Sequence, residues 1–355
     1  MRPELPTIGK ISAEVFDTII YPRLGRRRQE VLIGPQHGVD IGIVDLGGGQ
    51  VMALTTDPVF IVPPYGWERS AWFAVHILCS DAATSALPLA YMTIDLNLPR
   101  SITGEQFERL WTTIHEESDK LGVSIVTGHT GRYEGCDYPM VGGATVIAVG
   151  PKEKYIAPTM ARPGDAILIT KGAAVEAAGL FAATFPDRLA AEFGETFAHE
   201  AQEIFWQMSV VEEARIAADL GVRDDGVTAM HDATECGVWG GLVEIAGASD
   251  VGFVVEKEQV PVQEPIRKIC DFFGIDPYTS ISEGTLLLTC RPHRAAELER
   301  AFGDAGILAA TIGEIVPREQ GRTLRVGGHD EPLGHPRVDP FWEAFGKAAA
   351  QQPQD

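Results

Sequence analysis

Aspartates recur at widely separated points of this chain, at or beside the ends of apolar segments. They are Asp40 in Gly-Val-Asp, Asp57 in Thr-Thr-Asp-Pro, Asp81 in Ser-Asp-Ala-Ala and Asp232 in His-Asp-Ala-Thr. The segment Thr-Gly-His-Thr at 127–130 is a further polar motif of this kind. Carboxylates gathered in one cleft repel each other and need a cation, and oxygen ligands suit Mg²⁺, which commonly accompanies nucleotide phosphates. The pattern favours an ATP- and Mg²⁺-dependent enzyme whose site is assembled from several loops.

Each aspartate also has a purely structural explanation. Asp57 precedes Pro58, a position where turns favour Asp, and Asp232 would serve as the N-cap of the following helix. Asp40 would simply open a strand. Asp81 is the exception, because it lies in a largely apolar helix, where an unpaired buried carboxylate is costly. A cation partner for Asp81 is therefore the more informative hypothesis.

Other side chains of the proposed site are less specific. His129 would bind metal, contact phosphate or carry a proton, with Thr130 beside it, or it is an ordinary surface histidine. Lys10 would neutralise a transferring phosphate, or it is a solvated lysine. Cys136 and Cys236 would act as nucleophiles only with a base nearby, and otherwise they are small packed thiols.

The elements that must position these residues follow from periodicity and turn chemistry. Strands at 41–46 and 51–56 flank three glycines at 47–49, which allow positive φ in a hairpin turn. Thr103 and Gln106 form a capping-box pair at the start of a helix that ends at Gly122. Further strands are predicted at 91–97, 123–127, 140–149, 166–170, 227–231, 252–255, 285–290 and 309–315, and further helices at 11–21, 67–86, 173–184, 196–220, 237–248, 263–273 and 293–303.

Composition bounds the partners and the compartment. The 355 residues include 29 Lys plus Arg and 50 Asp plus Glu, a net charge of −21, which disfavours binding to nucleic acid or anionic membranes. Five cysteines without a Cys-x-x-Cys pair disfavour a disulfide framework or a structural zinc site. Neither a signal-peptide core nor a membrane span is recognised. We therefore expect a cytoplasmic protein that acts on a small-molecule substrate.

The order of the motifs resembles the superfamily of aminoimidazole ribonucleotide synthetase. Its members include thiamine-monophosphate kinase, selenophosphate synthetase and the carbamoyl dehydratase of hydrogenase maturation. The resemblance runs from about residue 5 to residue 326. The matching segments are Gly9-Lys10-Ile11-Ser12, Val39-Asp40 with Ile43-Val44-Asp45-Leu46, Thr56-Asp57, Ser80-Asp81-Ala82-Ala83, Asp232-Ala233-Thr234 with Gly237, Ser282-Glu283-Gly284 and Ile312-Gly313-Glu314.

The resemblance implies a fold and a set of roles. The fold is α+β, with an ATP/Mg-binding and dimerisation domain at 1–155, a second α+β domain at 156–326 and an irregular tail at 327–355. N-terminal domains pair into a barrel-like homodimer in this superfamily. Its aspartates hold Mg²⁺ against ATP, whose γ-phosphoryl group goes to an oxygen of the substrate. The residues that take these roles here are Asp40, Asp57, Asp81 and Asp232 for metal and nucleotide, Thr130 for nucleotide, and Lys10 and His129 for catalysis.

Departures from the superfamily keep alternatives open. Val39 stands where relatives often carry the first of two aspartates, His129 replaces an aspartate of the kinase and the dehydratase, and Cys236 replaces a glycine. The chain has no cysteine after Cys290 for carbamoyl transfer, and Thr7 stands where selenophosphate synthetase needs Cys or selenocysteine. The alternatives are therefore a thiamine-monophosphate kinase-like or hydrogenase-maturation-like enzyme, or a nucleotide-binding protein without catalysis.

Overall fold

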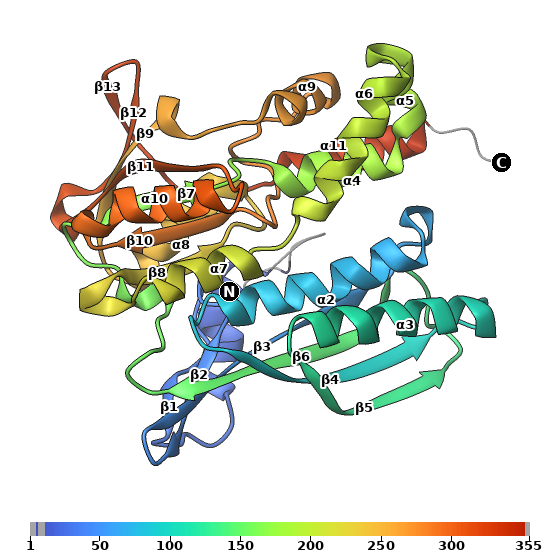
Figure 1. Ribbon diagram of the computed structural model, residues 1–355, viewed down its shortest axis with the longest axis horizontal. Coiled ribbons are helices and arrows are strands. Elements are labelled where there is room, and N and C mark those ends of the chain that lie inside the picture. The colour runs from blue at the N-terminus through green and yellow to red at the C-terminus, as the bar shows by residue number, and fades with distance from the viewer. Residues whose placement is uncertain (1–4, 6–10, 352–355) are drawn as a thin grey trace.

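The computed structural model describes residue 5 and residues 11–351. In its first half, segments in which apolar and polar residues alternate form a six-stranded sheet (Figure 1). In β3, Val51, Ala53 and Thr55 are buried on one face, as the pattern predicts. The three glycines between β2 and β3 have φ values of 76°, 60° and 78°, so the predicted hairpin turn is confirmed. In spatial order the strands are β1 (Val31–Ile33), β2 (Gly42–Gly47), β3 (Gln50–Phe60), β6 (Met140–Pro151), β4 (Leu89–Leu98) and β5 (Ser124–Arg132).

Two long helices, α2 (Trp67–Ala83) and α3 (Gly104–Lys120), pack on one face of this sheet (Figure 1). The predicted capping box begins α3: Thr103 Oγ1 accepts from the Gln106 backbone N–H at 3.2 Å, and Gln106 Oε1 accepts from the Thr103 N–H at 2.9 Å. The helix α2 is apolar almost all round, because α3, the sheet and the second half of the chain surround it.

The other face of the sheet is not covered by the described residues. Tyr91 and Met140, which point to this face, are 46% and 57% exposed. The segment at 11–23 forms only short turns: α1 (Ala13–Val15), a π-helical turn (Phe16–Ile20) and a 3₁₀ turn (Tyr21–Arg23). Val15 is buried, but Ile19 and Ile20 are exposed, so the expected apolar face of this segment is only partly covered within one chain.

The second half forms a seven-stranded mixed sheet between two apolar layers. In spatial order its strands are β13 (His329–Pro332), β12 (Arg322–Val326), β9 (Gly252–Glu256), β11 (Ala309–Val316), β7 (Ala166–Thr170), β10 (Leu286–Cys290) and β8 (Val227–Asp232). α8 (Gly237–Ala248) covers one face, while α7 (Val211–Asp219) and α10 (Ala295–Asp304) cover the other. β8 and β10 are buried along their whole length, as strands packed on both faces should be.

A third apolar layer is rich in phenylalanine. It joins α4 (Val175–Thr184), α5 (Pro186–Phe193), α6 (Glu195–Ala201), α9 (Glu264–Phe273) and α11 (Pro340–Ala350). Phe181 stacks on Phe273 with ring centroids 3.9 Å apart, and Phe341 meets Phe181 edge-on at 5.1 Å. The structure corrects the expectation of an irregular tail from residue 327. Residues 329–332 pair with β12, and residues 340–350 form α11, because the tail carries aromatic side chains that this layer buries.

The single helix predicted at 196–220 is also wrong. It is divided into α6, a 3₁₀ turn (Gln202–Gln207) and α7. The break has a physical cause: the carbonyl oxygens of Gln207 and Ser209 accept hydrogen bonds from Lys171 Nζ at 2.9 and 2.5 Å. These carbonyls are therefore turned away from the helical direction, and α7 starts afresh at Val211.

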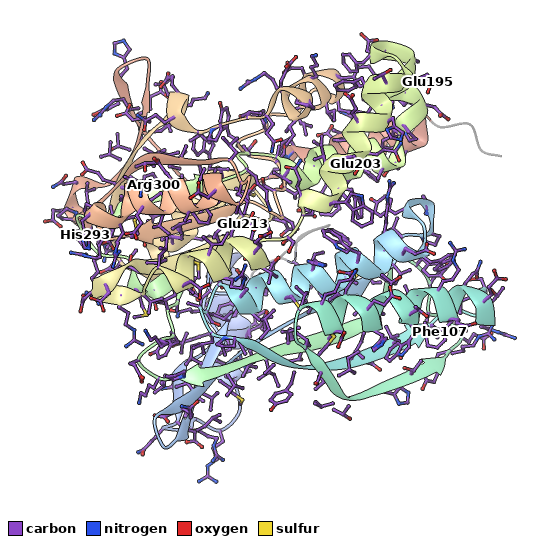
Figure 2. All side chains as sticks on the ribbon, viewed as in Figure 1. Phe107, Glu195, Glu203, Glu213, His293 and Arg300 are labelled. Atoms are coloured by element: carbon purple, nitrogen blue, oxygen red, sulfur yellow. The ribbon has the colours of Figure 1, made fainter. Side chains whose placement is uncertain are left out.

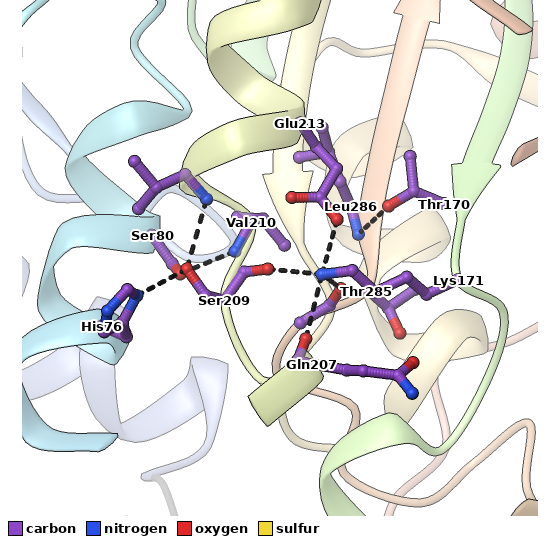
Figure 3. A network of polar contacts seen from close by, with 12 residues as sticks. His76, Ser80, Thr170, Lys171, Gln207, Ser209, Val210, Glu213, Thr285 and Leu286 are labelled. Carbon is purple, nitrogen blue, oxygen red and sulfur yellow. Dashed lines mark hydrogen bonds and ion pairs between the residues drawn. The ribbon is translucent and has the colours of Figure 1, made fainter. Parts of the chain in front are cut away.

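The two halves of the molecule meet at a polar network centred on this lysine (Figure 3). Lys171 Nζ also donates to the Gly284 carbonyl at 3.1 Å and forms an ion pair with Glu213 Oε1 at 2.5 Å. Helix α2 reaches the same region, because His76 Nδ1 lies 2.8 Å from Ser209 Oγ and Ser80 Oγ accepts from the Val210 N–H at 3.0 Å. The network thus fixes α2 against the second sheet.

In the described residues, none of the helices is long and apolar enough to cross a membrane.

All five cysteines are free thiols, as the sequence predicts for a chain without a disulfide framework. Cys79, Cys270 and Cys290 are buried, and burial raises the pKa of each of these thiols to about 12.

Replacing Lys171 by methionine is expected to destabilise the fold strongly. The variant leaves the buried Glu213 carboxylate without its counter-charge, which typically costs about 3–5 kcal/mol in the free energy of unfolding. Urea unfolding measures this loss. The double variant Lys171→Met/Glu213→Leu should be more stable than Lys171→Met, because it buries no lone charge. Lys268→Met, which breaks an exposed pair with Glu264, is the control and should change stability little. A double variant no more stable than the single one would refute this account.

Candidate active site

The four predicted aspartates converge where the two halves of the chain meet. Asp40 follows a short bridge between Gln36 and Val39, Asp57 lies in β3, Asp81 in α2, and Asp232 ends β8. Asp81 and Asp232 are 6% and 1% exposed. Burial, followed by the negative charges of Asp232, Asp40 and Asp57, raises the pKa of Asp81 well above its usual value. Asp57 is therefore not a turn residue, and the four side chains occupy one site.

Glu283 joins this cluster as a carboxylate to which the sequence assigns no role. It lies in the loop before β10 and is 1% exposed. Burial, together with the charges of Asp232 and Glu176, raises the pKa of Glu283 well above its usual value. The neighbouring Gly284 has its carbonyl bound by Lys171, so the network between the two halves also fixes the loop that carries Glu283.

Several oxygens of this cluster lack the partners that burial normally requires. Asp232 Oδ2 and both carboxylate oxygens of Glu283 have no hydrogen-bond partner among the described residues. Thr55 Oγ1 donates to Asp81 Oδ2 at 3.0 Å, which satisfies one oxygen of that residue. Buried carboxylates that face each other without donors are costly, and oxygen-only donor sets of this kind match hard divalent cations. The donor set therefore fits Mg²⁺.

His231 is a basic group at the edge of the cluster. Its Nδ1 lies 3.4 Å from Asp40 Oδ2, and its Nε2 lies 2.9 Å from Glu244 Oε2. Burial alone would lower the pKa of His231, but the hydrogen bond with Glu244 and the charges of Glu244, Asp40 and Asp232 raise it to about 9. In the absence of metal, an imidazolium at this position offsets part of the negative charge.

His129 and Thr130 lie within β5, not after a strand as expected. Across the sheet Asp57 pairs with Ala144, Ala144 with Ile94, and Ile94 with Gly128, so Gly128 lies on the same face as Asp57. Successive residues of a strand point to opposite faces, and His129 therefore points away from the face of Asp57. His129 borders a hollow of about 320 Å³ on the open face, and its Nε2 lies 2.5 Å from the Tyr133 hydroxyl. Within one chain, then, His129 does not join the aspartate cluster. Thr130 is exposed.

Lys10, the other predicted catalytic residue, lies outside the described residues. The site also contains residues to which the sequence analysis gave no role, namely Glu283, His231, Glu244 and Glu176. His231 adjoins Asp232, and Glu283 precedes an apolar strand, so both follow the strand-end pattern of the aspartates. Glu244 lies in the interior of α8, where no local sequence signal separates it from a solvated glutamate.

The two halves of the chain match the two domains of one protein family. The N-terminal domain of AIR synthase related protein matches residues 38–150, and its C-terminal domain matches residues 162–325. The curated relatives are distant. Carbamoyl dehydratase HypE of Rhizobium leguminosarum bv. viciae is 27% identical over 296 residues, covering 79% of this chain and 77% of its own length. A putative hydrogenase expression/formation protein of Methanocaldococcus jannaschii is 26% identical, covering 92% of this chain and 96% of its own.

Selenide, water dikinase of Enterobacter sp. (strain 638) is 24% identical, covering 89% of this chain and 93% of its own. Solved structures agree in fold. Hydrogenase maturation protein HypE in complex with ATP superposes with a TM-score of 0.64 at 23% identity, covering 92% of each chain. AaThiL complexed with AMPPCP and TMP gives a TM-score of 0.63 at 20% identity, covering 85% of this chain and 91% of that one. At these identities the structural likeness shows the fold alone.

Replacing Asp81 by asparagine is expected to stabilise the protein when EDTA removes divalent cations. The raised pKa means that the folded state holds the charged carboxylate unfavourably at pH 7, and the amide removes that charge while its oxygen still accepts from Thr55. The gain should shrink as the pH falls, because the wild-type carboxyl then becomes protonated. Thermal unfolding at pH 7 and pH 5 measures it. A loss of stability at pH 7 would contradict mutual repulsion within the cluster.

Proposed function

The chain belongs to the AIR synthase related protein family, and we propose that it is an enzyme that uses ATP and Mg²⁺ to transfer a phosphoryl group to an oxygen of a small molecule. The observation that carries this proposal is the buried carboxylate cluster, in which Asp232 Oδ2 and both oxygens of Glu283 have no hydrogen-bond partner among the described residues. Divalent cations would neutralise the charges of such a cluster. ATP in the complex of the similar protein HypE, and AMPPCP in the complex of AaThiL, support the choice of ATP as the ligand.

In this proposal, Asp40, Asp57, Asp81 and Asp232 hold Mg²⁺, with Glu283 beside them. The metal would neutralise the phosphate oxygens as charge shifts during transfer. The residues of the chain supply the positioning: Thr55 orients Asp81, His231 contacts Asp40, and the Lys171 network holds the loop of Glu283 against α2. Because the site draws on both sheets, its geometry depends on their docking.

The catalytic roles of Lys10 and His129 and the nucleotide contact of Thr130 remain part of the proposal. His129 lies on the open face of the first sheet, so it would reach a site of this kind only in another copy of the chain. This placement, together with the exposed apolar side chains of the same face, supports a homodimer formed through the first sheet.

The metal role is tested with Asp57→Asn and Asp81→Asn. Calorimetry with ATP, with and without Mg²⁺, reports binding, and a phosphate-release assay with a panel of acceptor molecules reports turnover. We expect each variant to lose Mg²⁺-dependent release by about 100-fold or more, as removal of one strong electrostatic contact typically does. The control is Asp304→Asn at the exposed end of α10. Unchanged release in both site variants would refute the metal assignment.

The same assay separates catalysis from simple binding. Tight, Mg²⁺-dependent ATP binding by the wild-type chain without phosphate release, with any acceptor of the panel, would favour a nucleotide-binding protein instead. Thiamine monophosphate belongs in the panel, because phosphorylation of this acceptor requires no cysteine.

The dimer is tested by placing a charge on the open face. Tyr91→Lys should shift the chain from dimer to monomer in sedimentation velocity, because a lysine in an apolar interface must lose its hydration. Leu308→Lys is the control, since Leu308 is similarly exposed, at 47%, but lies in the second half of the chain. A wild-type chain that sediments as a monomer at micromolar concentration, or a Tyr91→Lys chain that remains dimeric, would contradict this interface.

A further inference from the structure

One corner of the carboxylate cluster contains a nitrogen donor. Asp40, His231 and Asp232 each offer one ligand atom, and these atoms all lie within 4.8 Å of one another. His231 Nδ1 and Asp40 Oδ2 are 3.4 Å apart. Two ligands bound to one ion at about 2.1 Å lie about 3.0–3.4 Å apart when they meet at angles between square and tetrahedral. The observed separation is thus that of two atoms able to share one ion.

The imidazole is held from its other side by a carboxylate. Glu244 Oε2 accepts from His231 Nε2 at 2.9 Å, which directs Nδ1 toward Asp40. A carboxylate that binds the far nitrogen of a histidine is the usual support of a metal-bound imidazole. With a metal in place, the Nδ1 lone pair of His231 would point to the ion beside Asp40.

The backbone is shaped to keep these groups together. Gly38 has φ of +74°, and a Cβ at this residue would lie 2.8 Å from Cβ of Glu244. Only glycine allows the loop that carries Asp40 to approach α8 so closely. The loop is therefore pressed against the helix whose glutamate orients His231.

A second, independent feature points to a ligand at this corner. Asp232 is 1% exposed, and its Oδ2 has no hydrogen-bond partner among the described residues. Buried carboxylate oxygens normally have a donor or a cation. Asp232 is also one of the three grouped donors, so a carboxylate with an unsatisfied oxygen lies beside the position that an ion would take.

We propose that Asp40, His231 and Asp232 form a mixed nitrogen–oxygen site for a divalent transition-metal ion, next to the all-oxygen position that suits Mg²⁺. Imidazole is a good ligand for first-row transition ions, whereas Mg²⁺ favours oxygen. The inference rests on the proposed function in sharing Asp40 and Asp232 with it. The inference adds that one position takes a transition-metal ion. It also adds that His231 is a ligand of this ion and that Glu244 positions His231.

The test uses Mn²⁺ as the probe and the full chain without nucleotide. Electron spin-echo envelope modulation of bound Mn²⁺ detects a directly bound ¹⁴N nucleus. We expect ¹⁴N modulation in the wild type, its loss in His231→Gln, and its retention in His293→Gln. His293 is exposed beside α10 (Figure 2). It follows Cys290, which lies at the opposite end of β10 from Leu286, the partner of Asp232. Bound Mn²⁺ without ¹⁴N modulation in the wild type, or modulation that persists in His231→Gln, would overturn the proposal and leave His231 as a buried counter-charge.

A second variant covers the case in which His231→Gln fails to fold. Glu244→Gln retains an oxygen that accepts from Nε2 but removes the charge, so it should keep the ¹⁴N modulation and weaken Mn²⁺ binding by about 10-fold or more. Mg²⁺ binding should change far less. Equal effects on Mn²⁺ and Mg²⁺ affinity would contradict a nitrogen ligand.

These measurements are separable from the proposed enzyme activity. If phosphate release depends on Asp57 and Asp81 but no ¹⁴N modulation is seen, the enzyme proposal stands and the mixed site falls. If modulation is seen but no acceptor yields phosphate release, the mixed site stands as a metal-binding site and the proposed reaction falls.

Discussion

Mutual repulsion among buried carboxylates is the constraint on which the rest of this structure depends. Asp81, Asp232 and Glu283 are almost fully buried, and burial and neighbouring charge raise the pKa of each. A fold gains nothing in stability from such an arrangement, and natural chains keep costly local arrangements mainly at functional sites. The apolar layers around both sheets supply the stability that makes the cluster tolerable.

The cluster also explains why the two sheets are locked together. Asp57 and Asp81 come from the first half of the chain, whereas Asp232 and Glu283 come from the second. A shift of one half against the other would separate the carboxylates and destroy any shared cation position. Contacts from α2 to the segment before α7 oppose such a shift, because His76 Nδ1 lies 2.8 Å from Ser209 Oγ and Ser80 Oγ accepts from the Val210 N–H at 3.0 Å. Lys171 holds this segment to Glu213 and to the carbonyl next to Glu283 within the second half.

Much of the fold was predictable from local pattern, and the site only in part. The β2–β3 hairpin, the capping box of α3 and the exact span of α8 follow from glycines, a Thr–Gln pair and an apolar run, which act within a few residues. Asp40, Asp57 and Asp232 were found because they flank apolar runs, and Asp81 because it lies in a largely apolar helix. Glu244 was not found, since its role depends on packing between α8 and the loop of Gly38. Which residues of β5 face the site depends on its pairing with β4. The break before α7 depends on Lys171, which is distant from it in sequence.

The burial of β8 has a consequence for the independence of the two halves. β8 is the last strand of its sheet, yet all six of its residues are buried, and α2 from the first half lies against it. An edge strand that is apolar and unprotected is a template for aggregation. Expressed by itself, the C-terminal half would expose the part of β8 that α2 covers, and we expect this half to associate with itself.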